Sequence, residues 1–302
     1  MKVHLVDGTY ELFRHYFALP STTNDVGQEV GAVGGVLGSM LGMIEAGATH
    51  LAVATDQVIA SFRQGLWPGY KDGSGIEPEL HSQFPLLEEG LNALGVVVWP
   101  MAEHEADDGL AAGAAMAAAD PRVEQVLICT PDKDLTQCVV GDRVVQFDRR
   151  KREIRTADGV REKFGVPPTS MPDYLALVGD TSDGYPGLRG WGAKSAAAVL
   201  ARYEHLEHIP DSAGDWSVTV RGADKLAATL SQDRELALLF RRLATLDYQA
   251  PVSKDVDALA WTGPTPGFAA FCDTIKKPRL VERVQRLAAK QPTRQPTSTP
   301  DT

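Results

Sequence analysis

Three short runs of apolar and β-branched residues in this chain each end in an acid. VHLV is followed by Asp7, LAVAT by Asp56 and VLICTP by Asp132. Segments with helical periodicity separate these runs, over residues 30–46, 81–94 and 105–119. Strands that alternate with helices form a parallel sheet covered by helices, and sites in such sheets form at the carboxyl ends of the strands. The pattern predicts an α/β fold with three carboxylates at one edge of its sheet.

The strand-like runs stop at about residue 168. Helical segments take their place, over residues 172–179, 192–203, 232–246 and 278–290. We therefore expect an α/β core over residues 1–168 and a helical region over residues 169–290. The final stretch, QPTRQPTSTPDT over residues 291–302, carries three prolines among threonines and predicts a disordered tail.

Bulk properties narrow the class of protein. The 302 residues, 43% of them hydrophobic, suffice for one large or two moderate domains with a proper core. The longest apolar stretch, residues 30–44, is too short for a membrane span, and the N-terminus shows no cleavable signal. Three cysteines without a C-x-x-C pair and seven histidines without a finger pattern disfavour disulfides and zinc. We expect a cytoplasmic monomer that makes no membrane contact.

Acidic residues recur in four short motifs, VDGT, EADD, TPDKDL and GDTSDG. Each motif alone has an ordinary interpretation, because aspartates favour the positive N-terminal end of a helix and cap helices. Capping does not explain why acids end successive strands and recur in doublets. We interpret the set as one cleft. Together with Asp56, its members are Asp7, Glu105, Asp107, Asp108, Asp132, Asp134, Asp180 and Asp183.

Nine carboxylates in one cleft repel one another, and protonation or bound cations relieve that repulsion. Oxygen ligands favour Mg²⁺ or Mn²⁺, and magnesium usually takes only one or two carboxylates, so this number predicts at least two ions. Two ions roughly 3.5–4 Å apart can clamp a scissile phosphate. Removing nine negative charges from the net charge of −10 leaves about −1, so the remaining surface need not repel DNA.

A glycine-rich turn follows the last acidic motif, in the sequence GYPGLRGWGAKSA. Gly187, Gly190 and Gly192 allow a tight turn against a phosphate backbone, and Lys194 adds a positive charge at the start of the next helix. Backbone N–H groups at a helix start face such an anion, and contacts to phosphate carry no sequence information. The alternative is an ordinary glycine-rich loop between two helices.

The chain resembles the bacterial and phage 5′ nuclease family, which comprises the N-terminal 5′–3′ exonuclease domain of DNA polymerase I and free-standing flap endonucleases. The resemblance runs from about residue 2 to 290. Its motifs are VDGTYELFRHYFALP, TDQVIASFRQGLWPGYK, HEADD, TPDKDLTQ and LVGDTSDGYPGLRGWGAKSA. It implies a PIN-like parallel-sheet core with flanking helices, a helical arch over about 67–92, and a helix-hairpin-helix over about 185–203.

The resemblance also implies roles for single residues. Arg14 would contact DNA phosphate, Tyr70 would lie near the terminal base, and Arg63 and Lys71 would offset charge on the reacting phosphate. The glycine turn with Lys194 would hold duplex DNA, with a K⁺ ion bridging protein and duplex. The inner metal positions would be formed by Asp7, Asp56, Glu105, Asp107, Asp132 and Asp134, and the neighbouring or outer ones by Asp108, Asp180 and Asp183.

The chain departs from the family pattern at three positions. Gly184 stands where the family usually has Asn, Trp191 where it has an aliphatic residue, and Ser74 where it tends to have Arg. The change at Ser74 predicts the loss of one phosphate clamp in the arch. The residues around it, 72–75, include two glycines and predict loose structure there.

These observations predict a metal-dependent 5′–3′ exonuclease and flap endonuclease, acting on branched, nicked or 5′-flapped DNA in replication or repair and releasing a 5′-phosphorylated product. One alternative is a PIN-type ribonuclease, which the hairpin and the helical region disfavour. A second is a non-catalytic DNA-junction binding module, which is disfavoured because all nine acidic positions are filled.

Overall fold

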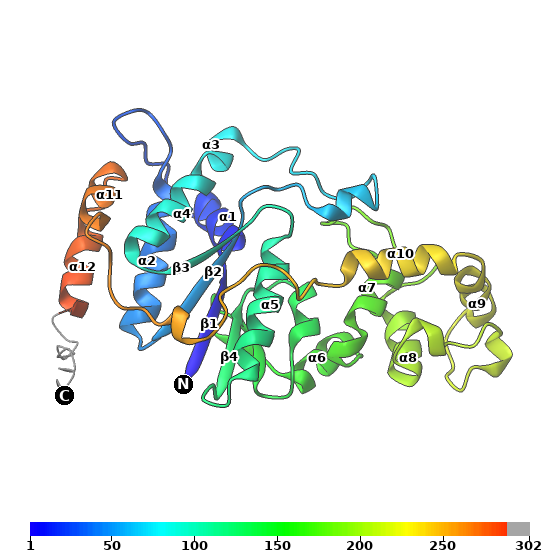
Figure 1. The fold of residues 1–302 in the computed structure, drawn as a ribbon. Coiled ribbons are helices and arrows are strands. Elements are labelled where there is room, and N and C mark those ends of the chain that lie inside the picture. The colour runs from blue at the N-terminus through cyan, green and yellow to red at the C-terminus, as the bar shows by residue number, and fades with distance from the viewer. Residues whose placement is uncertain (289–302) are drawn as a thin grey trace.

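The computed structural model describes residues 1–288 of the chain. Within them, six strands form one sheet in the order β3-β2-β1-β4-β5-β6 (Figure 1). Neighbouring strands are parallel except for β5 and β6, which are antiparallel. The strands are β1 (Lys2–Asp7), β2 (His50–Asp56), β3 (Val97–Met101), β4 (Gln125–Cys129), β5 (Val144–Asp148) and β6 (Glu153–Arg155).

Helices cover both faces of this sheet and continue beyond its edge as a separate group (Figure 1). Their bounds are α1 (Gly8–Ala18), α2 (Gly31–Glu45), α3 (Pro78–His81), α4 (Gln83–Leu94), α5 (Ala106–Ala119), α6 (Ala157–Phe164), α7 (Met171–Val178), α8 (Ala193–Tyr203), α9 (Ala223–Gln232), α10 (Arg234–Ala244), α11 (Phe268–Thr274) and α12 (Arg279–Ala288).

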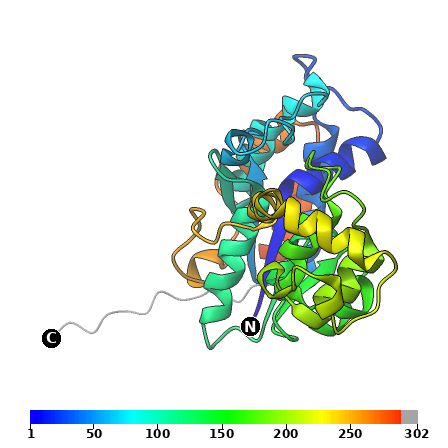
Figure 2. The same ribbon diagram turned by 90° about the vertical axis from the view of Figure 1, so that its right-hand side faces the viewer.

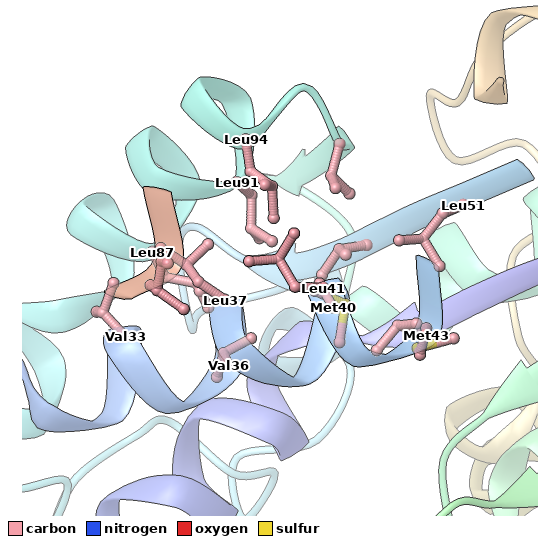
Figure 3. Packing of buried hydrophobic residues seen from close by; sticks show 14 of the residues in the cluster. Val33, Val36, Leu37, Met40, Leu41, Met43, Leu51, Leu87, Leu91 and Leu94 are labelled. Carbon is pink, nitrogen blue, oxygen red and sulfur yellow. The ribbon is translucent and has the colours of Figure 1, made fainter. Parts of the chain in front are cut away.

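Alternate residues of the central strands face two different helical layers, as the period of a strand requires. Leu5 of β1 packs with α5, whereas the next residue, Val6, packs in the cluster that contains α2 and α4. In that second layer, leucines of α2 and α4 face one another (Figure 3). On the other face, a Cβ added at Gly113 would lie 2.4 Å from the ring of Trp99. The small residues of α5 therefore let this helix lie close against the sheet.

Helices α6 to α10 enclose a second hydrophobic core to one side of the sheet (Figure 2). Val199, Leu226 and Phe240 are among its buried members. After α10 the chain runs back across the sheet, and α11 and α12 contact α4 and α2 respectively (Figure 1). The structure thus divides the predicted range 169–290 between two cores, because its last two helices pack with the α/β layer.

Most predicted elements are present. The strand-like runs that end at Asp7 and Asp56 form β1 and β2, and the segments 30–46 and 105–119 form α2 and α5. The sequence analysis missed β3, which contains Pro100. A proline is tolerated there because β3 lies at the edge of the sheet. The predicted tail lies outside the described residues. Within the described part of the chain, no helix has the length and apolarity needed to cross a membrane.

Candidate metal centre

The carboxyl ends of β1 and β2 deliver the first two acids. Asp7 ends β1 and caps α1, since its Oδ1 accepts a hydrogen bond from the N–H of Tyr10 at 2.8 Å. Its Oδ2 accepts from the hydroxyl of Thr130, just beyond β4, at 2.9 Å. Asp56 ends β2, and its Oδ1 accepts from the N–H of Ala106 at the start of α5 at 2.8 Å. Parallel pairing of β1 with β2 and β4 brings these groups to one edge of the sheet.

Two triplets of carboxylates form beside that edge and share one member. Oxygens of Asp107, Asp132 and Asp134 lie within 4.8 Å of one another, and so do oxygens of Asp134, Asp180 and Asp183. The first triplet comes from the start of α5 and the loop after β4. The second adds the loop between α7 and α8. Asp134 therefore joins the α/β core to the helical region.

The donor set suits hard divalent cations. The Oδ1 atom of Asp134 is buried and has no hydrogen-bond partner among residues 1–288. A buried, unpaired carboxylate oxygen is unfavourable unless a cation or a donor approaches it. Oxygen-only triplets of this kind match the ligands that Mg²⁺ and Mn²⁺ prefer. The residues present thus fit a metal centre.

The acids of the cleft are held at a cost in electrostatic energy. Burial raises the pKa of Asp107 and of Asp134, and the neighbouring charge of Asp132 raises both further. Burial likewise raises the pKa of Asp7, to about 7, and the pKa of Asp183. A bound cation reverses this balance, because it favours the ionised carboxylates.

Lys71 is a partly exposed cation of the cleft. Its Nζ lies 2.8 Å from Glu105 and 2.9 Å from Asp183, and 38% of its side chain is exposed. Burial alone would lower the pKa of Lys71, but the charges of these two carboxylates outweigh burial and raise it. Lys71 is therefore protonated at neutral pH and links the core to the loop after α7.

The structure places Arg63 and Asp108 beneath the cleft instead of in it. The Arg63 residue is 1% exposed, and its guanidinium forms two hydrogen bonds with Asp108, at 2.7 and 2.8 Å. Asp108 is fully buried. The phosphate contact predicted for Arg63 and the metal ligation predicted for Asp108 stay predictions. In this structure the two groups neutralise each other through their paired hydrogen bonds. Tyr70 is also buried, and its hydroxyl donates to Glu105 at 3.3 Å.

The predicted DNA contacts lie at two places. Arg14, on α1, pairs with Glu11 at 2.5 Å. In the hairpin, Gly187 and Gly190 have φ angles of 67° and 86°, the left-handed region that glycine adopts most readily. Gly192 precedes α8, and Lys194 in its first turn is exposed. These hairpin residues other than Gly187 line a hollow of about 550 Å³ together with Arg221.

Two of the three departures from the family pattern have a local explanation. Gly184 has φ 83°, and a Cβ added there would lie 2.0 Å from the carbonyl oxygen of Gly69. Trp191 is buried and donates from its indole N–H to the carbonyl of Leu226 at 3.2 Å, so the larger ring anchors the hairpin to α9. Ser74 lies in a helix-free stretch between residues 66 and 77.

Sequence reasoning missed two residues of the cleft. The Nζ of Lys133 lies 2.5 Å from Asp180 and offsets the charge of the second triplet. The sequence could have indicated Lys133, because this residue stands between two acids in the motif TPDKDL. Tyr185 is 1% exposed, and its hydroxyl has no partner in the described chain. Burial raises its pKa, as do the charges of Asp134 and Asp183. Neither the residue type of Tyr185 nor its spacing predicted that it would lie in the cleft.

Comparison with known proteins agrees with this geometry. Residues 2–165 match the family model described as "5'-3' exonuclease, N-terminal resolvase-like domain", and residues 166–266 match "5'-3' exonuclease, C-terminal SAM fold". The chain is 34% identical over 297 residues to DNA polymerase I of Bacillus caldotenax, covering 93% of this chain and 33% of that protein. It is 33% identical over 267 residues to DNA polymerase I of Bacillus subtilis, covering 87% of this chain and 30% of that protein.

Solved structures share the fold. A T5 5′-exonuclease with bound zinc superposes with a TM-score of 0.64 at 20% identity, covering 94% of this chain and all of the other. The catalytic core of Rad2 in complex with a DNA substrate superposes with a TM-score of 0.62 at 14% identity, covering 95% and 92%.

The fold and the acidic cleft define a metal-dependent 5′ nuclease. The chain belongs to the 5′–3′ exonuclease family, to which the family models assign residues 2–266. It spans about a third of the length of the curated DNA polymerase I relatives that it matches.

Proposed function

We propose that the chain is a structure-selective 5′–3′ exonuclease and flap endonuclease, which hydrolyses phosphodiester bonds of branched, nicked or 5′-flapped DNA in replication or repair. The observation that carries this proposal is the pair of carboxylate triplets joined by Asp134, whose buried Oδ1 is unpaired among the described residues. Two structural relatives support the substrate class, a T5 flap endonuclease in complex with DNA and metal ions and the catalytic core of Rad2 in complex with a DNA substrate.

The two triplets would hold at least two Mg²⁺ or Mn²⁺ ions, with Asp7 and Asp56 at the strand ends beside them. Such ions, when bound, polarise the scissile phosphate and lower the pKa of a water molecule. Lys71 stays protonated between Glu105 and Asp183, and we propose that it offsets charge on the phosphate as the reaction proceeds. Glu105 orients the ammonium for that task.

The hairpin between α7 and α8 would bind the duplex through its backbone. Gly187 and Gly190 take left-handed conformations, and the exposed Lys194 stands at the start of α8. Contacts of this kind read the phosphate backbone and not the bases, so cleavage would depend on DNA structure. A K⁺ ion at this turn and a phosphate contact by Arg14 stay part of the proposal.

A labelled 5′-flap duplex tests the function. We expect cleavage in Mg²⁺, none in chelator, and loss of cleavage in Asp134→Asn. Asp158→Asn is the matched control, because Asp158 is an exposed acid that pairs with Arg161 at the surface. A matched RNA flap that is cut faster would instead support the ribonuclease. Binding of the DNA flap without cleavage in either metal would support the junction-binding module.

A further inference from the structure

Arg63 uses every donor of its guanidinium within residues 1–288. A guanidinium has five N–H groups in a rigid planar fork. The Nη1 atom donates to Glu105 at 3.1 Å and to Asp108 at 2.8 Å, and Nη2 donates to Asp108 at 2.7 Å. The carbonyl of Thr245 accepts from Nη2 at 3.0 Å, and the carbonyl of Leu243 accepts from Nε at 2.9 Å. A phosphate would have to displace one of these acceptors.

Asp108 is saturated in the same way. Its Oδ1 accepts from Arg63 and from the N–H of Asp247 at 2.8 Å. Its Oδ2 accepts from Arg63 and from the N–H of Glu105 at 3.0 Å. Two oxygens with two hydrogen bonds each fill the lone-pair positions of a carboxylate. The neighbouring Asp107 belongs to the first metal triplet, so adjacent residues of one motif have different surroundings.

The pair joins three segments that are distant in the sequence. Arg63 comes from the 3-10 turn Phe62–Gly65 after β2, and Asp108 from the first turn of α5. The partners within residues 243–247 are two carbonyl acceptors and the N–H of Asp247. They belong to the last turn of α10 and to the link by which the chain returns to the α/β core. Leu243 packs in the core of the helical region, whereas Leu246 packs in the core around α5. The pair therefore lies where the two cores meet.

One carboxylate connects this pair to the cleft. The Oε1 atom of Glu105 accepts from Arg63 and from the hydroxyl of Ser61 at 2.7 Å. This leaves Oε2 to face Lys71 at 2.8 Å, and Lys71 reaches Asp183 on the helical side. Glu105 therefore shares the ammonium of Lys71 with Asp183, a member of the second triplet.

We propose that Arg63 and Asp108 form a latch that fixes the helical region on the α/β core and holds Glu105 and Lys71 in position for catalysis. They are positioning residues, and neither touches metal or DNA. The inference rests on the proposed nuclease function for its catalytic part. Lysine cannot replace Arg63, because a single ammonium lacks the planar fork that serves five acceptor atoms on two other segments of the chain.

Arg63→Lys, Asp108→Asn and their double variant test the latch. Since misplacing a reacting group by about 1 Å costs about 10²-fold in rate, we expect kcat on a 5′-flap to fall by about 10²-fold in each single variant with KM nearly unchanged. The double variant should be no slower than the slower single one, because both changes break one unit. Hydrogen exchange at residues 243–247 should accelerate in all three.

Arg241→Lys is the matched control. Arg241 also joins two carboxylates, Asp173 at 3.1 Å and Glu207 at 2.6 Å, but both lie within the helical region. The variant Arg241→Lys should leave kcat and the hydrogen exchange of residues 243–247 at wild-type values. Titration with Mn²⁺ separates the latch from ligation. Asp108→Asn should bind Mn²⁺ as the wild type does, and Asp134→Asn should bind it more weakly.

Three outcomes would overturn the latch. They are wild-type kcat and exchange in Arg63→Lys, weakened Mn²⁺ binding in Asp108→Asn to the level of Asp134→Asn, or a double variant slowed by the product of the single effects. If Arg63→Lys does not fold, Gln137→Ala replaces it. Gln137 holds the same link, through the carbonyl of Ala244 at 2.9 Å and the N–H of Leu246 at 3.1 Å. Its amide also donates to the carbonyl of Asp134 at 2.9 Å, so Mn²⁺ binding of the variant must equal that of the wild type for the result to count. In Gln137→Ala, hydrogen exchange at residues 243–247 should then be faster and kcat on the 5′-flap lower than in the wild type.

Failure of the proposed function would look different. A wild-type protein that cuts no flap in Mg²⁺ would refute the nuclease proposal alone. The hydrogen-exchange and Mn²⁺ measurements on Arg63→Lys and Asp108→Asn would still decide whether the pair joins the two cores.

Discussion

Two neighbouring layers of buried charge differ in how they are balanced. In the lower layer, Arg63 and Asp108 neutralise each other through paired hydrogen bonds. In the cleft above, burial and the charge of Asp132 raise the pKa of Asp107 and of Asp134. Lys71 lowers the pKa of Asp107 and Lys133 lowers that of Asp134, but neither cation outweighs burial. Buried charge that the chain balances itself holds the fold together, whereas unbalanced charge marks the place for an external cation.

Asp134→Asn should weaken metal binding in the cleft and give the largest effect on catalysis. A metal ion contributes several kcal/mol of transition-state stabilisation, so kcat should fall by roughly 10³-fold. In chelator the same variant should be more stable than the wild type, because it removes a buried carboxylate whose pKa is raised by burial and by the charge of Asp132. Flap cleavage and urea unfolding measure the two effects.

Added Mn²⁺ should reverse the order of stability, since the wild type binds the ion better. Asp158→Asn should behave like the wild type in both media. A variant that is less stable in chelator would show that Asp134 is not held under electrostatic strain.

Arg63→Met should break the balanced layer and show the opposite sign. Removing one partner of a buried ion pair costs about 3–5 kcal/mol, because the remaining charge is left unpaired. We expect this loss in urea unfolding both with and without Mn²⁺, because Asp108 does not bind the ion in the proposed latch. A loss that Mn²⁺ restores would instead mean that the freed Asp108 becomes a ligand.

The contrast also explains what could be predicted from sequence. Asp7, Asp56 and Asp132 follow strand-like runs, and the rule for parallel sheets places such ends at one edge. The partners of Arg63 could not be predicted, because its carbonyl acceptors lie 180 residues or more along the chain. Their proximity depends on how two cores dock.

Two features of the fold could not be predicted from the sequence. Pro100 hides β3, since a proline breaks a strand pattern unless the strand is at an edge. The helical periods of α11 and α12 predict amphipathic helices, but a period does not say against which core a helix packs. The roles of individual site residues stay predictions, including the DNA contacts of Arg14 and Lys194.

The pH dependence of the metal-free protein should sharpen the comparison. Burial raises the pKa of Asp7 from 3.8 to about 7, so the folded state binds more protons than the unfolded state between these values. Stability must then fall as pH rises from about 4 to about 7. With each kcal/mol worth about 2–4 °C, we expect the Tm in chelator to decrease by several degrees between pH 5 and 7.5.

Saturating Mn²⁺ should abolish that decrease, because the ion favours ionised carboxylates. In Arg63→Met the decrease should persist, since the latch takes no part in it. A Tm in chelator that rises over this pH range would contradict the raised pKa of Asp7.

Gly184→Ala tests how closely the second triplet depends on its loop. Its added Cβ would lie 2.0 Å from the carbonyl oxygen of Gly69, at a position with φ 83°. Gly222→Ala is the control, because Gly222 has φ 75° with nothing within 4 Å. A left-handed conformation alone costs an L-residue about 1–2 kcal/mol, so Gly222→Ala should lose that amount and Gly184→Ala more. Urea unfolding that shows equal losses would mean that the segment at Gly69 moves freely, and the contact would then not support the position of Asp183.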